Sequence, residues 1–253
     1  MSQLAVLISV YKPNVDLLIE TFNSLKSQNF KDFTVYVCID GKDAELEKII
    51  RRFDQKLDLK FFVNEKNIGL TKSLNLLLER SSEPLVARLD AEDICYKERF
   101  IKQIQEFSEN EELVLCGSHY CLISNNEKNI IQMPCTDAEI RREIRTRNPF
   151  LHSAVMFRRM TDIKYDESFK YTQDYDLWIR LAKLGLVQNV DDILLIRNET
   201  NGISSIYAVE QLIYKVKIKY KHFAYLLSTA LIISLCKNII KILLLLIKRI
   251  IVR

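Results

Sequence analysis

The chain has 253 residues, of which 48% are apolar and 28% are charged. This composition excludes an intrinsically disordered or collagen-like protein and is sufficient for one sizeable core or two small ones. Only 5 Gly and 4 Pro are present, so long flexible linkers and a Gly-rich nucleotide-binding loop are not expected. The 6 cysteines include no C-x-x-C pair, which favours free thiols in a reducing cytoplasm over a zinc site.

The first 107 residues alternate short apolar runs with helical patterns, which is typical of β-α-β units and a parallel sheet. We expect strands over residues 4–10, 33–39, 59–63 and 85–89, and helices from Asn14 to about 25 and over 43–53, 70–80 and 96–107. An open doubly wound sheet of this kind binds its ligand at the carboxyl ends of the strands. Asp40 and Asp90 both fall there.

The second half of the chain is less regular and predicts an α+β extension. We expect strands over residues 113–117, 119–124, 129–133 and 153–157, and helices over 137–145 and 173–184. Leu177, Trp178 and Leu181 share the apolar face of the last helix.

Charge divides the chain at residue 210. Residues 1–210 carry a net charge of −5, whereas no acid follows Glu210. Nine cations follow it instead: Lys215, Lys217, Lys219, Lys221, Lys237, Lys241, Lys248, Arg249 and Arg253. Because the cations are confined to the tail and alternate with Ile and Leu, an anionic membrane surface is the expected partner, and nucleic acid is not.

Residues 223–247 form a largely apolar segment that is long enough to span a bilayer. Lys237 and Lys241 lie near its middle, and on a helix they share one face with Lys248. Charges at the bilayer centre are costly, whereas a helix lying in the plane of the membrane lets them meet anionic headgroups. We therefore expect in-plane binding over residues 211–253, ahead of a spanning or an oligomerisation helix, and expect the tail to be dispensable for chemistry.

An acidic cluster follows the fourth expected strand: Asp90, Glu92 and Asp93 stand within four residues, directly after Arg88 and Leu89. Neighbouring carboxylates repel one another unless a cation lies among them, and a divalent cation held by one or two of them can bridge a diphosphate. The cluster could instead be a solvated acidic turn. Its position directly after an apolar strand favours the metal site. The chain has neither a G-x-G-x-x-G nor a P-loop motif, so dinucleotide oxidoreduction and NTP hydrolysis are not expected.

Other polar residues at the same sheet edge have two interpretations each. Asp40 can accept hydrogen bonds from a base or a ribose, or simply form an Asp-Gly turn. Asn67 and Lys72 stand near the start of a helix, where capping alone could explain Asn67. Asp174 begins the Trp178 helix, and a carboxylate there is often only a cap.

The order of these motifs resembles family 2 of the inverting glycosyltransferases, which have the GT-A fold and include bacterial surface-polysaccharide enzymes. The resemblance covers most of residues 4–206 and rests on six short matches in the family's order. They are Ile8-Ser9-Val10-Tyr11, Ile39-Asp40-Gly41, Asn67-Ile68-Gly69-Leu70 with Asn75, Arg88-Leu89-Asp90-Ala91-Glu92-Asp93, residues 152–158 from His152 to Arg158, and residues 165–178 from Tyr165 to Trp178.

The resemblance implies an α/β fold with a nucleotide-sugar-binding half over residues 1–110 and an acceptor-binding half over 111–210. It also implies transfer of a hexose from a nucleoside diphosphate sugar, such as a UDP-sugar, to a lipid-linked saccharide at the cytoplasmic face of the inner membrane, with Mn²⁺ or Mg²⁺ as cofactor. Its site residues here are Asp174 as general base; Asp40, Asn67, Lys72, Arg88 and Asp90 for the donor; Asp90 and Glu92 for the metal; and His152, Trp178 and Asp93 in contact with the acceptor or supporting such contacts.

The chain departs from the family pattern at three positions. Glu92 stands where Asp is frequent, which keeps a hard oxygen ligand on a side chain one methylene longer. Ile39 replaces a second acid beside Asp40, and Gln173 replaces the Glu before Asp174. Arg197 and Ser204-Ser205 match a late family loop only loosely.

Two other function classes remain open on the sequence. A sugar nucleotidyltransferase would use a similar sheet, but it needs a Gly-rich basic loop where this chain has Ser9 to Pro13. A non-catalytic, membrane-associated protein that binds nucleotide sugars would leave the acidic cluster without a chemical role.

Overall fold

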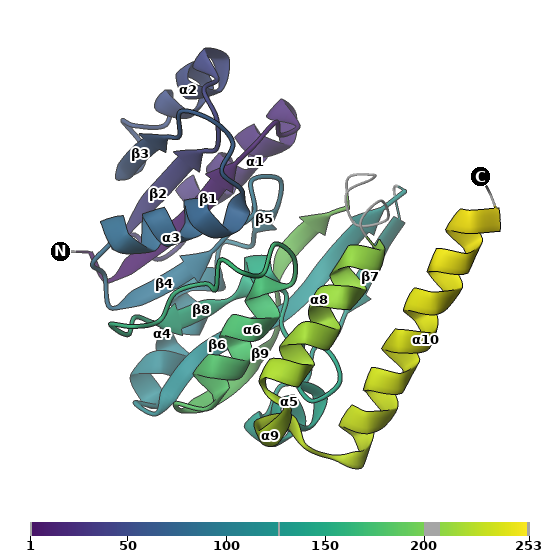
Figure 1. The fold of residues 1–253 in the computed structure, drawn as a ribbon. Coiled ribbons are helices and arrows are strands. Elements are labelled where there is room, and N and C mark those ends of the chain that lie inside the picture. The colour runs from purple at the N-terminus through teal and green to yellow at the C-terminus, as the bar shows by residue number, and fades with distance from the viewer. Residues whose placement is uncertain (1, 126, 200–207, 252–253) are drawn as a thin grey trace.

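A computed structural model describes residues 2–125, 127–199 and 208–251 (Figure 1). Its centre is a nine-stranded mixed sheet of order β3-β2-β1-β4-β8-β6-β9-β5, with β7 paired to β6 beside that path. The strands are β1 (Leu4–Val10), β2 (Phe33–Ile39), β3 (Leu59–Val63), β4 (Leu85–Arg88), β5 (Ile94–Cys95), β6 (Leu113–Ser124), β7 (Glu127–Ile131), β8 (Met156–Arg158) and β9 (Leu186–Asn198).

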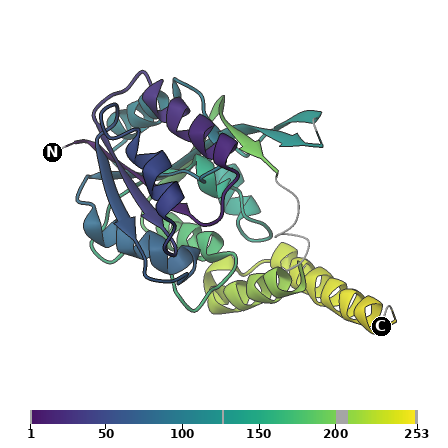
Figure 2. The same cartoon turned by 90° about the horizontal axis from the view of Figure 1, so that it is seen from above.

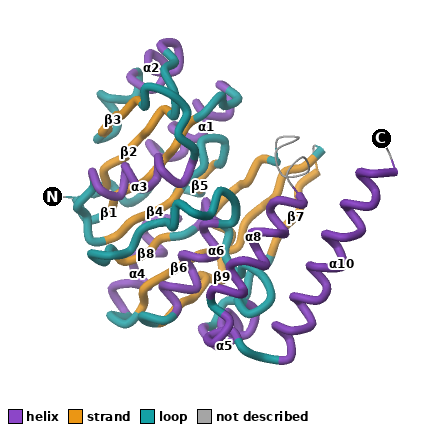
Figure 3. Tube along the Cα trace, viewed as in Figure 1, coloured by secondary structure: helices purple, strands orange, loops and turns teal. Residues whose placement is uncertain are grey.

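The helices pack against both faces of this sheet (Figure 3). They are α1 (Val15–Lys26), α2 (Ala44–Arg51), α3 (Leu70–Arg80), α4 (Arg99–Glu109), α5 (Asp137–Glu143), α6 (Gln173–Ala182), α8 (Ala208–Lys221), α9 (Phe223–Leu226) and α10 (Thr229–Ile251), with a 3₁₀ turn at His152–Ala154. Helices α1, α2 and α4 bury their apolar stripes in one core. Helices α3, α5 and α6 do so in the other, which gives a three-layer α/β/α arrangement.

The first half follows the sequence prediction closely. Strands β1, β2, β3 and β4 pair in parallel, and each of them was expected from an apolar run. Asn14 caps α1 by accepting hydrogen bonds from Asp16 N and Leu17 N at 3.1 and 3.3 Å. The strand order reverses between β1 and β4, so the carboxyl ends of β1, β2 and β4 open onto a common crevice.

The second half differs from the prediction in one main respect. The two expected strands before Asn125 form one strand, β6, and β6 pairs in parallel with β9, which was not predicted. Because β8 joins β4 to β6, the expected nucleotide-binding and acceptor-binding halves share a single sheet. The expected strand from Ser153 begins three residues later, because the 3₁₀ turn occupies its start.

The basic tail is packed against the body, contrary to the expectation of a separable segment. Helix α8 crosses the boundary expected at residue 210. Ile218, Leu226 and Leu231 are fully buried and belong to the same core as α6. Figure 2 shows α8 lying along the body while the far end of α10 extends away from it. A cut near residue 205 would therefore expose core side chains and is not expected to release an intact domain.

The apolar segment of the tail is interrupted. It divides into α9 and α10, and Ser228 between them accepts a hydrogen bond from Leu231 N at 3.1 Å. In the part of the chain that the structure describes, no helix combines the length and the apolar character that crossing a membrane requires.

The cysteines are free thiols, as expected. Cys38, Cys95, Cys116 and Cys121 are buried as small core side chains, Cys135 is half-buried, and Cys236 is exposed on α10.

Candidate active site

A cleft of about 400 Å³ lies at the carboxyl ends of β1, β2 and β4. Ser9 and Tyr11 line it from β1, Asp40 follows β2, and Asn67 belongs to the loop before α3. The acidic segment 90–93 closes the cleft on the β4 side. This is the place where an open α/β sheet binds its ligand, and we call it the donor cleft.

Asp40 lines the donor cleft and binds the loop that leads to α3. Its side chain is 2% exposed and accepts hydrogen bonds from Asn64 Nδ2 at 2.9 Å and from Ile68 N and Gly69 N at 2.8 Å each. Gly69 has φ of 91°, a conformation that is strained for residues with a Cβ. Asp40 therefore fixes the loop at the start of α3, and its carboxylate is already engaged by the protein.

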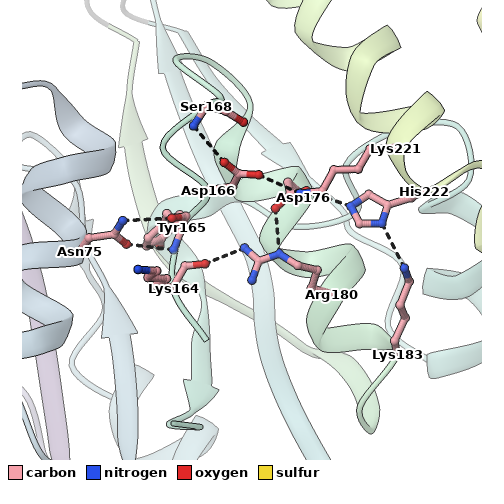
Figure 4. A network of polar contacts seen from close by, with 10 residues as sticks. All are labelled: Asn75, Lys164, Tyr165, Asp166, Ser168, Asp176, Arg180, Lys183, Lys221 and His222. Carbon is pink, nitrogen blue, oxygen red and sulfur yellow. Dashed lines mark hydrogen bonds and ion pairs between the residues drawn. The ribbon is translucent and has the colours of Figure 1, made fainter. Parts of the chain in front are cut away.

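The polar residues of α3 and of the loop before it have different positions. Asn67 lines the donor cleft, whereas Lys72 is an exposed side chain on α3 and does not belong to the lining of the cleft. Asn75 is buried and exchanges two hydrogen bonds with the backbone of Tyr165, at 3.0 and 2.9 Å (Figure 4). Asn75 therefore holds the loop that leads to α6.

Arg88 is fully buried, so it does not contact the donor directly as the sequence interpretation expected. Its guanidinium donates to the backbone oxygens of Leu7 and Leu89 and to the Asp90 carboxylate. Desolvation alone would raise the pKa of Asp90, but the charge of Arg88, with a smaller contribution from Arg197, lowers it below its usual value. Arg88 thus orients Asp90 and keeps it ionised.

Glu92 and Asp93 complete the acidic cluster. Glu92 Oε1 accepts a hydrogen bond from Asn14 N at 2.8 Å. Asp93 is 3% exposed, and its Oδ2 has no hydrogen-bond partner in the described part of the chain. Burial and the charge of Asp90 raise the pKa of Asp93 to about 7. An unpaired buried oxygen and mutual repulsion among carboxylates both fit a hard divalent cation at this cluster.

Strand β9 supplies two site residues that sequence reasoning largely missed. Asn198 donates from Nδ2 to Glu92 O at 2.6 Å and from its backbone N to Asp93 Oδ1 at 3.3 Å, which holds the acidic segment in place. Arg197 lines both the donor cleft and a second cavity. The loose motif match had pointed to Arg197, whereas Ser204 and Ser205 lie outside the described residues.

The second cavity has a volume of about 610 Å³ and contains Asp174. Asp90 and Arg197 line both this cavity and the donor cleft, so the two meet at these side chains. Thr172, which precedes α6, has a left-handed φ of 59° and does not cap the helix with its side chain. We call this space the acceptor cavity.

Asp174 lines the acceptor cavity from the first turn of α6. Its Oδ2 accepts a hydrogen bond from Asn148 Nδ2 at 2.7 Å. Burial raises the pKa of Asp174, although hydrogen bonds from the backbone and from Asn148 oppose the shift. A carboxylate with a raised pKa that lines a cavity can take up a proton. Asn148, 26 residues away in an irregular segment, carried no sequence signal.

His152 lines the acceptor cavity, and Trp178 lies behind it. His152 Nε2 is 2.9 Å from the hydroxyl of Tyr165. Burial and the charge of Arg88 lower the pKa of His152 to about 3, so its ring is neutral at ordinary pH. Trp178 is fully buried and packs on Phe150 and His152. It therefore supports the cavity wall and does not itself contact an acceptor.

A network of charges fixes α8 to α6. Asp176 on α6 is fully buried and accepts from Arg180 Nε at 2.8 Å, from Lys221 Nζ at 2.7 Å and from His222 Nε2 at 2.8 Å (Figure 4). Lys183 lies 3.0 Å from His222 Nδ1. Since a lysine ammonium only donates, His222 Nδ1 is the acceptor and its Nε2 carries the proton. The tail is thus anchored two residues from Asp174.

Another group of possible metal ligands, His119, Cys135 and Asp191, has ligand atoms within 4.8 Å of one another. Met133 N donates to His119 Nδ1 at 3.0 Å, so a neutral ring carries its proton on Nε2. That nitrogen lies 2.9 Å from Asp191 Oδ1 and donates to it. His119 therefore presents a proton and not a lone pair toward this group, and the acidic cluster at Asp90 is the better metal site.

The chain is similar to known proteins both in sequence and in fold. Residues 5–165 match the family described as Glycosyl transferase family 2. The chain belongs to this family. It is 33% identical over 238 residues to the amylovoran biosynthesis glycosyltransferase AmsE of Erwinia amylovora, a match that covers 89% of each chain. It is 28% identical over 199 residues to an Escherichia coli UDP-Gal:alpha-D-GlcNAc-diphosphoundecaprenol beta-1,3-galactosyltransferase, covering 76% of this chain and 72% of that one.

Solved structures share the GT-A fold. S. aureus TarS 1–349 in complex with UDP-GlcNAc superposes with a TM-score of 0.72 at 19% identity, over 86% of this chain and 66% of that one. The mannosyltransferase PcManGT from Pyrobaculum calidifontis, in complex with GDP-Man and Mn²⁺, gives a TM-score of 0.69 at 11% identity, over 88% and 64%. Family 2 membership identifies the chain as a glycosyltransferase. It excludes the two alternatives, a sugar nucleotidyltransferase and a non-catalytic protein that binds nucleotide sugars.

Proposed function

We propose that this glycosyltransferase is inverting and metal-dependent, and that it transfers a hexose from a nucleoside diphosphate sugar, a UDP-sugar, to a lipid-linked saccharide during assembly of a surface polysaccharide. The observation that carries the proposal is the junction of two cavities. Asp90 lines both the donor cleft and the cavity that contains Asp174. A donor in one and an acceptor in the other would meet beside these two carboxylates.

The residues suggest a division of roles in a single displacement. Asp174 takes the proton of the acceptor hydroxyl while that oxygen attacks the anomeric carbon, and the nucleoside diphosphate leaves from the opposite face. Arg197, at the junction of the cavities, is placed to stabilise the negative charge that develops on the departing diphosphate. Asn148 holds the Asp174 carboxylate in one orientation at 2.7 Å.

Asp90 and Glu92 would hold a divalent cation, Mn²⁺ or Mg²⁺. The unpartnered oxygen of Asp93 supports this placement, and PcManGT, with the same fold, has been solved with GDP-Man and Mn²⁺. When bound, the cation would neutralise charge on the leaving diphosphate. Asp93, buried beside Asp90, maintains the cluster rather than contacting the acceptor.

The proposal is tested by measuring transfer and stereochemistry together. A panel of nucleotide sugars is screened for Mn²⁺-dependent protection against thermal unfolding, and the sugar that protects is then used as the donor. We expect an α-linked donor to give a β-linked product in the NMR spectrum. An α-linked product would contradict inversion, and protection by no nucleotide sugar would contradict the assigned donor site.

Attachment to the cytoplasmic face of a membrane through α10 is part of the proposal. The outward side chains of this helix are between 48% and 61% exposed: Ile232, Ile233, Ile239, Ile240, Leu243 and Leu244. The sequence had assigned the membrane-facing role to Lys237, Lys241 and Lys248. Instead Lys241 lines the acceptor cavity, and the Lys248 side chain is outside the described part of the chain. The apolar face is therefore the better candidate for insertion.

Sedimentation with phosphatidylglycerol–phosphatidylcholine vesicles tests this face. We expect Ile240→Gln combined with Leu244→Gln to weaken vesicle binding about tenfold or more, because each change removes roughly 2 kcal/mol of apolar transfer energy. Ile130→Gln, an equally exposed apolar side chain on β7, is the matched control and should bind normally. Equal binding by the double variant would exclude this face as the attachment site.

A further inference from the structure

The lining of the acceptor cavity carries an excess of positive charge. The cavity lining contains the carboxylates of Asp90 and Asp174 and five basic side chains: Arg147, Arg197, Lys215, Lys219 and Lys241. Helices α8 and α10 supply the three lysines. A cavity meant only for a neutral sugar needs no such excess of positive charge, so the charge indicates an anionic part of the ligand.

Two of these cations are available to a ligand. Lys219 already donates to Thr146 O at 2.8 Å and to Ser234 Oγ at 2.6 Å, and Arg147 pairs with Glu143. In the part of the chain that the structure describes, neither Lys215 nor Lys241 forms an ion pair. Lys215 lines the same cavity as Lys219 and Asp174, and its charge lowers the pKa of both of these groups.

The side-chain amide of Asn238 is a second, independent indication of a ligand, because it lacks a hydrogen-bond acceptor among the described residues. It lines the same cavity one helical turn before Lys241. Its Nδ2 is buried and finds no hydrogen-bond acceptor among the described residues. A buried amide without an acceptor is costly unless a ligand supplies one. Two ammonium groups and one amide therefore converge on a space that suits phosphate oxygens.

Hydrogen bonds hold the helices that carry these groups against the body. Lys221 and His222 bind Asp176, which fixes the end of α8 to α6 (Figure 4). Ser234 joins α10 to α8 through Lys219. Helix α10 thus has a polar face toward the cavity and an apolar face, which includes Ile240 and Leu244, toward the outside.

We propose that Lys215, Lys241 and Asn238 bind the diphosphate of a prenyl-diphosphate-linked acceptor, so that the prenyl chain continues past α10 into the membrane. This inference rests on the proposed function and names the part of the acceptor that the cavity recognises. The donor diphosphate is a different group, because it belongs in the cleft on the other side of Asp90. Recognition of the lipid diphosphate brings the acceptor sugar to Asp174 and selects lipid-linked over free saccharides.

Calorimetric titration of the full chain with geranyl diphosphate, with saturating UDP and Mg²⁺ present to fill the donor cleft, tests the inference. We expect geranyl diphosphate to bind under these conditions, inorganic diphosphate to bind more weakly, and geraniol not to bind. Lys215→Gln and Lys241→Gln should each weaken binding about tenfold, since each removes a charged hydrogen bond. Lys215→Arg and Lys241→Arg should restore most of it.

The matched controls are Lys217→Gln on α8 and Lys237→Gln on α10, whose side chains are exposed and outside the cavity lining. In solution both should bind geranyl diphosphate as the unmodified chain does. Displacement of geranyl diphosphate by UDP, or equal losses in control and cavity variants, would overturn the inference. Inorganic diphosphate binding as tightly as geranyl diphosphate would overturn the lipid assignment. Sugar transfer to a neutral glycoside would still show that the proposed function holds.

Discussion

Asp174→Asn is expected to lower the turnover number by about 10²- to 10⁴-fold, the usual contribution of a general base. The amide keeps the size of the carboxylate and can still hydrogen-bond with Asn148, which lies 2.7 Å away, but it cannot take up the acceptor proton. Donor affinity should change little, because Asp174 lines the acceptor cavity and not the donor cleft. Such a loss of turnover without loss of binding marks an interaction made in the transition state.

The pH dependence of turnover provides the check. Asp174 acts only when ionised, and burial raises its pKa. Activity should therefore fall on acidification at a pH above the value of about 3.9 that is usual for aspartate. Asn148→Ala removes a donor that stabilises the carboxylate, so it should shift the acidic limb to higher pH with a smaller loss of maximal turnover. A loss of donor affinity in Asp174→Asn that matches the loss of turnover would reassign Asp174 to binding.

The first half of the fold was predictable because each strand is a short, largely apolar run. Residues 4–10, 33–39 and 59–63 form β1, β2 and β3 with the expected bounds. Strand β9 lacks such a run, since Asn189, Asp191 and Asp192 interrupt it. Shifts in its register against β6 near Ser118 and His119 let these polar residues remain in the strand. Periodicity alone cannot detect a strand of this kind.

The candidate site was predictable where a motif lies at the end of a strand or the start of a helix. Asp90, Glu92 and Asp174 line two adjoining cavities, and the roles that the resemblance implies for them stay predictions. Arg88 and Asn148 show the limit of this reasoning, because their contacts depend on packing across the chain. Arg88 reaches the backbone of Leu7 across 81 residues, and no local pattern states whether such a side chain faces a ligand or the core.

The charge pattern of the tail also did not reveal which of its side chains face the body of the protein. Helical periodicity separated a polar stripe containing Lys237 and Lys241 from an apolar stripe, and α10 has both. The sequence could not state which stripe meets the body. Two contacts decide it, since Lys219 is buried against Ser234 and Leu231 enters the core. Asn238 and Lys241 therefore line the acceptor cavity, so the tail contributes side chains to the proposed acceptor site.

Asp90→Asn is expected to abolish detectable transfer and to remove the metal-dependent part of nucleotide affinity. Asp90 is the carboxylate shared by both cavities and a proposed metal ligand, and an amide oxygen is a much weaker ligand for a divalent cation than a carboxylate. Titration of UDP with and without Mn²⁺ measures the effect. The unmodified chain should bind UDP more tightly with Mn²⁺, whereas the variant should bind equally weakly in both conditions.

Asn is a better replacement than Ala at this position because Arg88 is fully buried beside it. Removal of the whole side chain would leave the buried guanidinium without its carboxylate partner and would lower the free energy of unfolding. The amide oxygen of Asn can still accept from Arg88, so a normal melting temperature would separate lost chemistry from lost folding. EDTA should reproduce the inactivity in the unmodified chain, and added Mn²⁺ should reverse it there but not in Asp90→Asn. Full activity in EDTA would refute a metal at Asp90. Arg197 would then be the proposed group that stabilises the negative charge on the departing diphosphate.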